Sequence, residues 1–107
     1  MTIEEIYQFI PESFILTNHK IKVTIVDRID ENNYGDWNDI SNEIRLSRTL
    51  KCDDKIIELS KIQIENTFYH ELAHALMFFT GIKQDEMIAQ GFANLIYDYV
   101  HTRKYQN

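Results

Sequence analysis

The pentapeptide His70-Glu71-Leu72-Ala73-His74 constrains this chain more than any other segment, because its two histidines can act together only on a helix. On an α-helix, residues i and i+4 lie on one face about a turn apart, so both imidazoles can bind one metal ion. Glu71 then stands beside the first ligand, where it can act as general base on a water molecule held at the metal. The pattern predicts a helical metal site with its own base.

The flanking sequence predicts a helix of matching length, from about Ser60 to Thr80. Ser60 and Gln63 fit a capping box at its start, and Gly81 fits the left-handed residue that ends many helices. Between these signals, apolar residues recur with a helical period. They are Ile62, Phe68, Leu72, Leu76 and Phe79.

A second helix is expected over residues 85–100, after the short turn of residues 81–84. Its apolar positions also have a helical period, which indicates a core-facing stripe. They are Ile88, Phe92, Leu95, Ile96, Tyr99 and Val100. The longer metzincin pattern, H-E-x-x-H-x-x-G-x-x-H, is excluded because Met77 and Thr80 stand at its last glycine and histidine.

A catalytic zinc ion usually takes three protein ligands and keeps one position for water, so a third ligand must lie outside the pentapeptide. Glu86 is favoured, because it lies in the first turn of the second helix with Ala89 and Ala93 on its face. Small residues let two helices approach as closely as a shared metal requires. Asp85 and the downstream His101 remain alternatives.

The segment H-E-L-A-H-A-L, a short turn and then E-x-x-A-x-x-F-A together resemble the ImmA/IrrE group of small zincin-like metallopeptidases. Many members of that group are encoded by bacteriophages and mobile elements. The second motif comprises Glu86, Ala89, Phe92 and Ala93, and Glu65–Tyr69 before the first motif is also similar to the short phage-borne members. The resemblance covers about residues 60–100.

The resemblance implies a gluzincin-like zinc site in which the ligands and the base are His70, His74, Glu86 and Glu71. It also implies hydrolysis of a peptide bond in a protein substrate, since members of the group often act on a neighbouring DNA-binding repressor. The N-E-x-x-x-D pattern of larger gluzincins is not kept: Asp85 replaces its asparagine, and Gln90 stands where an aspartate would orient a ligand histidine.

The whole chain, residues 1–107, is expected to form one α+β domain, a minimal zincin-like unit. A short N-terminal helix is predicted from a capping box at Thr2 and Glu5, and Pro11 ends it. A small antiparallel sheet should precede the two helices. Its strands are expected at Ile21–Asp27, Tyr34–Trp37, Glu43–Ser47 and Lys55–Glu58.

The strand Glu43–Ser47 should direct Ile44 and Leu46 into the core and Glu43, Arg45 and Ser47 outward. By resemblance to zincins, this strand is the candidate edge along which an extended peptide would add itself to the sheet. The competing interpretation is an edge that its charged residues protect from pairing.

Composition narrows the possible partners and compartment. A net charge of −6, with eleven scattered Lys and Arg residues, argues against nucleic-acid binding. No apolar run reaches the roughly 18 residues of a membrane span, and the polar N-terminus does not resemble a signal peptide. The single Cys52 cannot form an internal disulfide, so a cytoplasmic location is expected.

The sequence therefore predicts a zinc metallopeptidase in which Glu71 is the base, and Tyr97 and His101 are candidate donors to the attacked carbonyl oxygen. One alternative is a metal-binding regulatory or interaction protein with little peptidase activity. A second alternative is a metal-free pseudo-enzyme that binds a partner through its strand edge. The sequence identifies neither the substrate nor the oligomeric state.

Overall fold

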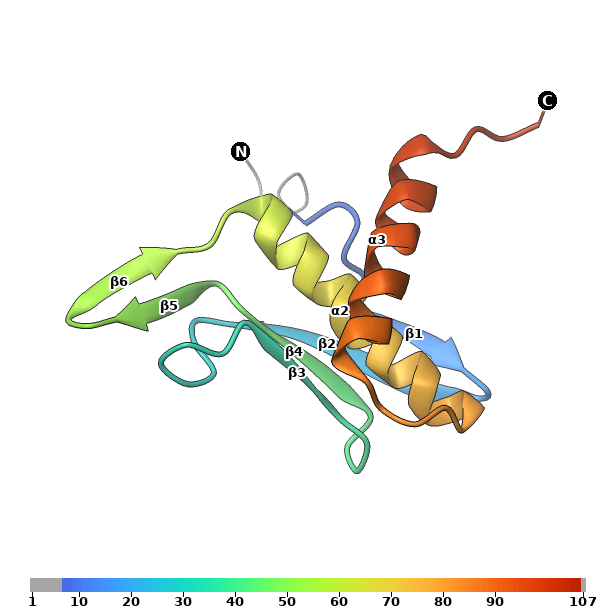
Figure 1. The fold of residues 1–107 in the computed structure, drawn as a ribbon, viewed down its shortest axis with the longest axis horizontal. Helices are drawn as coiled ribbons and strands as arrows, with labels where there is room; N and C mark the ends of the chain where they lie inside the picture. The colour runs from blue at the N-terminus through green and yellow to red at the C-terminus, as the bar shows by residue number, and fades with distance from the viewer. Residues whose placement is uncertain (1–6, 107) are drawn as a thin grey trace.

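The computed structural model describes residues 7–106 and has α+β architecture (Figure 1), which confirms the expected fold class. Within these residues, six strands precede two long helices. The strands are β1 (Ser13–Leu16), β2 (His19–Val26), β3 (Gly35–Asn38), β4 (Glu43–Ser47), β5 (Thr49–Cys52) and β6 (Lys55–Glu58). The helices are α2 (Lys61–Thr80) and α3 (Glu86–Thr102).

The expected antiparallel sheet is wrong in one respect, because the four-stranded sheet is mixed. Its strand order is β1-β2-β4-β3, and β2 pairs with β4 in parallel, with Val23 opposite Ile44. The β1–β2 and β3–β4 pairs are antiparallel. Strand β4, which carries the fully buried apolar residues Ile44 and Leu46, takes a central position, and β3 lies outside it.

Two strands, β1 and β5, were not expected from the sequence. The first extends the sheet beside β2, while β5 pairs with β6 in a separate two-stranded sheet. Figure 1 shows the β5–β6 hairpin projecting away from the four-stranded sheet. Its buried residues are Thr49 and Leu50 on β5, whereas Ile56 and Ile57 on β6 are exposed.

Helix α2 covers one face of the four-stranded sheet and closes the core. The buried cluster includes sheet, α2 and α3 residues: Ile21, Val23, Ile44, Leu46, Ile64, Phe68, Tyr69 and Ala93. Ser47 was expected to face outward, but it is fully buried. Its hydroxyl accepts the N–H of Ile29 at 3.0 Å and donates to the carbonyl of Asn33 at 2.7 Å, because the loop before β3 folds over the end of β4.

The ends of α2 confirm the predicted caps. Ser60 and Gln63 form a reciprocal capping box, and Gly81 ends the helix in the left-handed conformation with φ +78°. This backbone conformation favours glycine over residues with a Cβ atom. The expected apolar stripe begins only after Ile62, which is exposed.

Helix α3 forms where expected, but its large apolar residues do not all face the core. Its two buried residues are Ala89 and Ala93, which pack on the side of α2. Four members of the expected core stripe are exposed instead: Ile88, Phe92, Leu95 and Tyr99. The close approach of the alanines to α2 rotates these residues outward.

Most of the expected N-terminal helix lies outside the described residues. Within residues 7–106, Tyr7–Phe9 form a turn, and the N–H of Ile10 donates to the carbonyl of Tyr7 at 2.9 Å. Neither α2 nor α3 has the length and apolar character that a helix crossing a lipid bilayer needs.

Candidate metal centre

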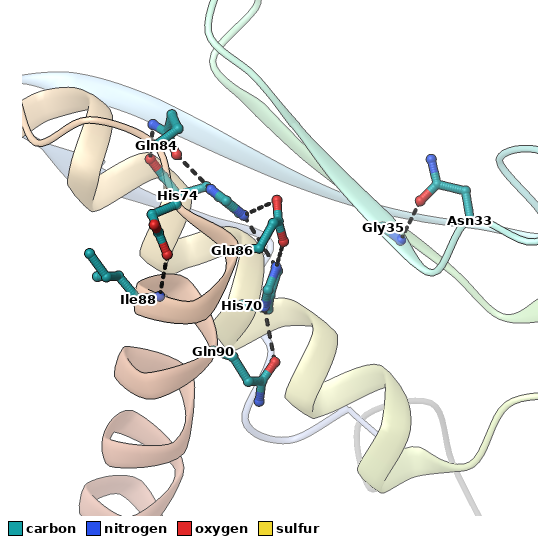
Figure 2. A network of polar contacts seen from close by, with 9 residues as sticks. Asn33, Gly35, His70, His74, Gln84, Glu86, Ile88 and Gln90 are labelled. Carbon is teal, nitrogen blue, oxygen red and sulfur yellow. Dashed lines mark hydrogen bonds and ion pairs between the residues drawn. The ribbon is translucent and has the colours of Figure 1, made fainter.

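Three side chains from two helices converge on one point at the crossing of α2 and α3 (Figure 2). Nε2 of His70 lies 2.7 Å from one carboxylate oxygen of Glu86, and Nε2 of His74 lies 3.1 Å from the other. The two Nε2 atoms are 3.2 Å apart. The ligand atoms of the three residues all lie within 4.8 Å of one another, so the trio can hold a metal ion.

Local structure explains why Glu86, and not Asp85, joins the histidines. Asp85 is the N-cap of α3, and its carboxylate accepts the N–H of Ile88 at 2.9 Å. Glu86 therefore starts the first turn on the side that faces α2. Ala73 on α2 and Ala89 on α3 belong to one buried cluster, so small side chains bring the two helices close at this level.

Two glutamines hold His70 and His74 in one tautomer. Nδ1 of His74 lies 2.6 Å from Oε1 of Gln84, whose amide nitrogen donates to the His74 carbonyl at 3.0 Å. Nδ1 of His70 lies 3.0 Å from Oε1 of Gln90, whose amide nitrogen donates to Asn94 at 2.9 Å. Because each amide nitrogen is engaged elsewhere, each Oε1 must accept, and Nδ1 of each imidazole is the protonated nitrogen.

This tautomer leaves both Nε2 lone pairs directed at Glu86 and at each other, which is repulsive unless a cation lies between them. Two nitrogens bound to tetrahedral zinc at about 2.0–2.1 Å would be about 3.3 Å apart. The observed 3.2 Å between Nε2 of His70 and of His74 is close to that value. Two neutral imidazoles and one carboxylate form a donor set that suits Zn²⁺.

Glu71 lies beside these ligands and is only 8% exposed. Burial raises its pKa to about 7, although the neighbouring His70 and His74 act in the opposite direction. The pKa of Glu86 is lowered: burial would raise it, but the two imidazoles beside its carboxylate outweigh that effect. A buried carboxyl with a pKa near neutrality can both accept and release a proton at physiological pH.

Two pockets meet at Glu71, one on each side of the metal cluster. A pocket of about 340 Å³ is lined by His70, Gln90 and a set of uncharged polar residues that includes Asn32, Asn33, Tyr34, Asn66 and Thr67. A second pocket, of about 430 Å³, is lined by Gly35, Asp36, Trp37, His74, Gln84 and Glu86. Glu71 can therefore reach ligands bound on either side.

The strand beside both pockets is β3, and it is an edge strand of the sheet. The expected edge, Glu43–Ser47, is wrong, because this segment is β4 and pairs on both sides. At Gly35, a Cβ atom would come within 2.6 Å of Thr67 Cγ2 on α2 and within 2.9 Å of the Arg45 carbonyl. Glycine at this position lets β3 approach α2, the helix that carries His70 and His74, closely.

Charge on the edge strand is balanced within the sheet. Asp36 of β3 forms an ion pair with Arg45 of β4, whose Nε donates at 3.0 Å. The hydrogen bond to Asp36 raises the pKa of the Arg45 guanidinium. Trp37, which lines the second pocket, also packs against Phe78 and Phe79 near the end of α2.

The other sequence candidates lie away from the cluster. His101 stacks on Tyr97, with ring centroids 4.2 Å apart, and its Nε2 contacts the buried carboxylate of Glu65. Glu65 also accepts the hydroxyl of Tyr69 at 3.0 Å. Neither His101 nor Tyr97 lines a pocket at Glu71. His101 therefore does not belong to the cluster, and neither residue lies beside Glu71 as the sequence analysis expected of a donor.

Sequence reasoning missed the orienting role of Gln84. The residue lies in the turn between the helices, and no spacing rule connects it with His74. It also missed the ion pair of Glu65, although a single acidic residue between Ile64 and Phe68, both buried, was a usable signal. An acidic residue on an apolar helix face requires a partner.

Comparison of the chain with models of known protein families, with curated proteins and with solved structures finds no significant match.

Proposed function

We propose that this chain is a zinc-dependent peptidase domain of the ImmA/IrrE-like small zincin type. The observation that carries the proposal is the pair of Nε2 atoms, 3.2 Å apart and both directed at Glu86, with the buried Glu71 beside them. A structural ion pair would need only one histidine and one carboxylate. Two histidines held in the metal-binding tautomer and a neighbouring carboxyl of raised pKa form the set that metal-assisted hydrolysis uses.

In this proposal His70, His74 and Glu86 hold the ion, and Gln84 and Gln90 hold the histidines in place. Zinc supplies Lewis acidity toward a water molecule and toward the substrate carbonyl. Glu71 accepts the proton of the attacking water and transfers it to the leaving amine. Glu71 is buried beside the cluster and lines both neighbouring pockets, which supports this role.

The substrate segment would bind as an extended strand along the open edge of β3. Backbone groups of an edge strand are free to pair with a peptide, and pockets beside it can select its side chains. Gly35 holds this edge against α2, so the peptide would cross the metal cluster between the two pockets. By the resemblance, a repressor protein encoded next to this gene is the first substrate to try.

A donor to the developing oxyanion must come from a residue other than Tyr97 or His101. Tyr34 lines the same pocket as His70 and Glu71, and its phenol is the candidate we favour. The exposure of Tyr34 leaves it free to turn toward a bound carbonyl.

The alternative is a metal-binding regulatory domain with little or no peptidase activity. The favouring observation is that neutral amides, not carboxylates, accept from Nδ1 of both ligand histidines. A carboxylate in that place raises ligand basicity, so glutamines give a weaker metal–histidine interaction. Turnover separates this alternative from the peptidase, and zinc content separates both from a metal-free binding protein.

The first experiment measures zinc in the purified protein by elemental analysis. We expect about one zinc per chain in the parent and almost none in a His70→Ala, His74→Ala double variant. Equal zinc in the two proteins would reject the site. His19→Ala is the matched control, because His19 stacks on Phe79 away from the cluster and should not change the zinc content.

The second experiment tests the base. Glu71→Gln keeps the shape of the side chain but cannot accept the proton, so zinc content and fold should persist while cleavage of the repressor falls by about a hundredfold or more. Undiminished cleavage by Glu71→Gln would contradict the mechanism. If the zinc-loaded parent cleaves no candidate repressor, the regulatory alternative replaces the peptidase.

A further inference from the structure

One side of α3 carries large apolar side chains that contact little of the described chain. Ile88, Phe92, Leu95 and Tyr99, which we call the outer face of α3, are 45%, 40%, 66% and 66% exposed. Met87 lies beside them and is 86% exposed. A soluble domain rarely leaves such a contiguous row uncovered on one element, so the row indicates an interaction surface.

The outer face lies opposite the metal ligand of the same helix. At 100° per residue, Ile88 is about 160° around the helix from Glu86. Ala89 and Ala93 pack against α2 on the Glu86 side. Covering the outer face would therefore leave the metal cluster and β3 accessible, and this inference does not depend on the proposed function.

The spacing of these apolar residues along α3 is suited to packing against a second helix. The intervals between Ile88, Phe92, Leu95 and Tyr99 are four, three and four residues, the alternation that lines up one seam of a helix pair. Gly91 flanks this seam, and a Cβ atom there would meet nothing within 4 Å. Glycine inside a helix costs about 1 kcal/mol relative to alanine, and no contact within the described chain explains it. The missing side chain would let a partner helix approach closely.

The available area suits a small, reversible dimer. Five large side chains that each expose on the order of 100 Å² offer about 500 Å² per chain. Two such faces would bury about 1,000 Å² in total, which is near the lower limit for a specific protein interface.

Charge sets the direction of the partner helix. Asp85 lies at the start of α3, whereas Arg103 and Lys104 follow its end. In an antiparallel pair, the acidic start of each helix lies beside the basic end of the other. The positive end of each helix dipole also lies beside the negative end of its partner's dipole, which is favourable. A parallel pair would bring like charges together at both ends. We propose that the outer face of α3 binds the same face of a second copy of this chain, in antiparallel orientation.

The proposal is tested on the full chain by sedimentation velocity from low to several hundred micromolar. The parent should shift from the mass of one chain to twice that mass as its concentration rises. Leu95→Glu should remain a monomer throughout, because it places a charge at the centre of the seam. Ile40→Glu should dimerise like the parent, because Ile40 is 93% exposed in the turn between β3 and β4.

Far-UV circular dichroism and zinc content should be unchanged in both variants, which separates loss of pairing from loss of fold or of the metal site. A parent that stays monomeric at every concentration overturns the proposal and assigns the outer face to a different protein. Dimerisation of Leu95→Glu equal to that of the parent also overturns it.

Cross-linking tests the orientation in a Cys52→Ser background, which removes the only native thiol. In the antiparallel pair Tyr99 lies opposite Ile88 of the partner, so mixed Ile88→Cys and Tyr99→Cys proteins should form a disulfide on oxidation. Tyr99→Cys alone should not, because the two copies of residue 99 would be about 16 Å apart. Efficient self-cross-linking of Tyr99→Cys would overturn the antiparallel arrangement.

Discussion

The contact between α2 and α3 holds a histidine–carboxylate group near each end, and the two groups differ in what satisfies their polar atoms. Near the start of α3, Glu86 faces two imidazole nitrogens that carry no proton, and its side chain is 79% exposed. Toward the other end, Glu65 is only 4% exposed and accepts from both His101 and Tyr69. The polar atoms of the first group would be satisfied by a bound cation, whereas the second group is complete without one.

Both groups contain histidine and glutamate, so residue types do not distinguish them. A metal site and a structural ion pair differ instead in how deeply the carboxylate is buried and in whether the neighbouring side chains carry protons to donate. Burial, and then the hydrogen bond to Glu65, raises the pKa of Tyr69, so the phenol remains a donor. A buried carboxylate with two protein donors satisfies the requirement for buried charge. The pair of His101 and Glu65 is therefore expected to stabilise the docking of α3 without binding metal.

The largest effect should come from removing the exposed carboxylate. Glu86→Ala is expected to lower zinc affinity by about a hundredfold or more, because it removes one of three ligands, while the metal-free protein keeps its stability. Competition with a chromogenic chelator measures the affinity. Asp85→Ala is the neighbouring control and should cost about 1 kcal/mol of helix capping with little change in zinc affinity. The reverse ranking would move the ligand to Asp85.

Removing the buried carboxylate should lower stability and leave zinc affinity unchanged, the opposite of the Glu86→Ala result. Glu65→Ala is expected to lower the free energy of unfolding by about 3 kcal/mol, because it leaves Tyr69 and His101 without their acceptor. Urea denaturation measures this loss, and Glu65→Gln, which retains an acceptor, should lose less. Zinc affinity of the folded Glu65→Ala protein should match the parent. A hundredfold loss of zinc affinity with unchanged stability would break the distinction between the two groups.

A smaller, pH-dependent effect should come from Glu71. In the metal-free protein its native pKa is about 7, against an ordinary value of 4.5, so between these values the native state binds more protons than the unfolded state. The Glu71 contribution to stability is thus complete below about pH 4.5 and is lost as the pH rises through 7. Glu71→Gln should reduce the fall in unfolding free energy between pH 5 and pH 8 by roughly 2 kcal/mol. Identical pH profiles for parent and variant would contradict the raised pKa.

The smallest effect should come from the orienting amides. Gln84→Ala is expected to weaken zinc binding by about tenfold, because the imidazole of His74 loses the acceptor that holds its tautomer. Gln84→Glu should instead strengthen zinc binding by increasing the basicity of that ligand. Both changes are measured by the chelator competition used for Glu86. Unchanged affinity in both variants would show that the amide does not orient the ligand.

Local signals in the sequence predicted the parts of the fold that depend on local interactions. The caps at Ser60 and Gly81 and the bounds of β4 agree with expectation, because capping and side-chain alternation are set within a few residues. The clustering of Glu86 with the histidines was also expected, from the small residues Ala89 and Ala93 that let the helices approach.

The sequence analysis missed the features of the fold that depend on contacts between residues far apart in the chain. The parallel pairing of β2 with β4 joins residues about twenty positions apart, and no local pattern distinguishes it from an antiparallel meander. Ser47 is buried because a loop folds over it, and alternation alone assigned it outward. The apolar residues of α3 predicted a core face, but periodicity cannot tell a stripe that faces the core from one that faces solvent.

The residues of the candidate metal cluster and the two glutamines beside its histidines lie within one uninterrupted stretch, from His70 to Gln90, and the sheet contributes only the neighbouring wall. A cation bound there would cross-link segments only about a dozen residues apart, and short loops cost little entropy to close. The helical hairpin could thus be organised by metal early in folding, ahead of the sheet. It also forms a portable unit for protein engineering: grafted beside a different sheet, the hairpin would carry the candidate metal cluster along, while the new sheet determined which molecules reach it.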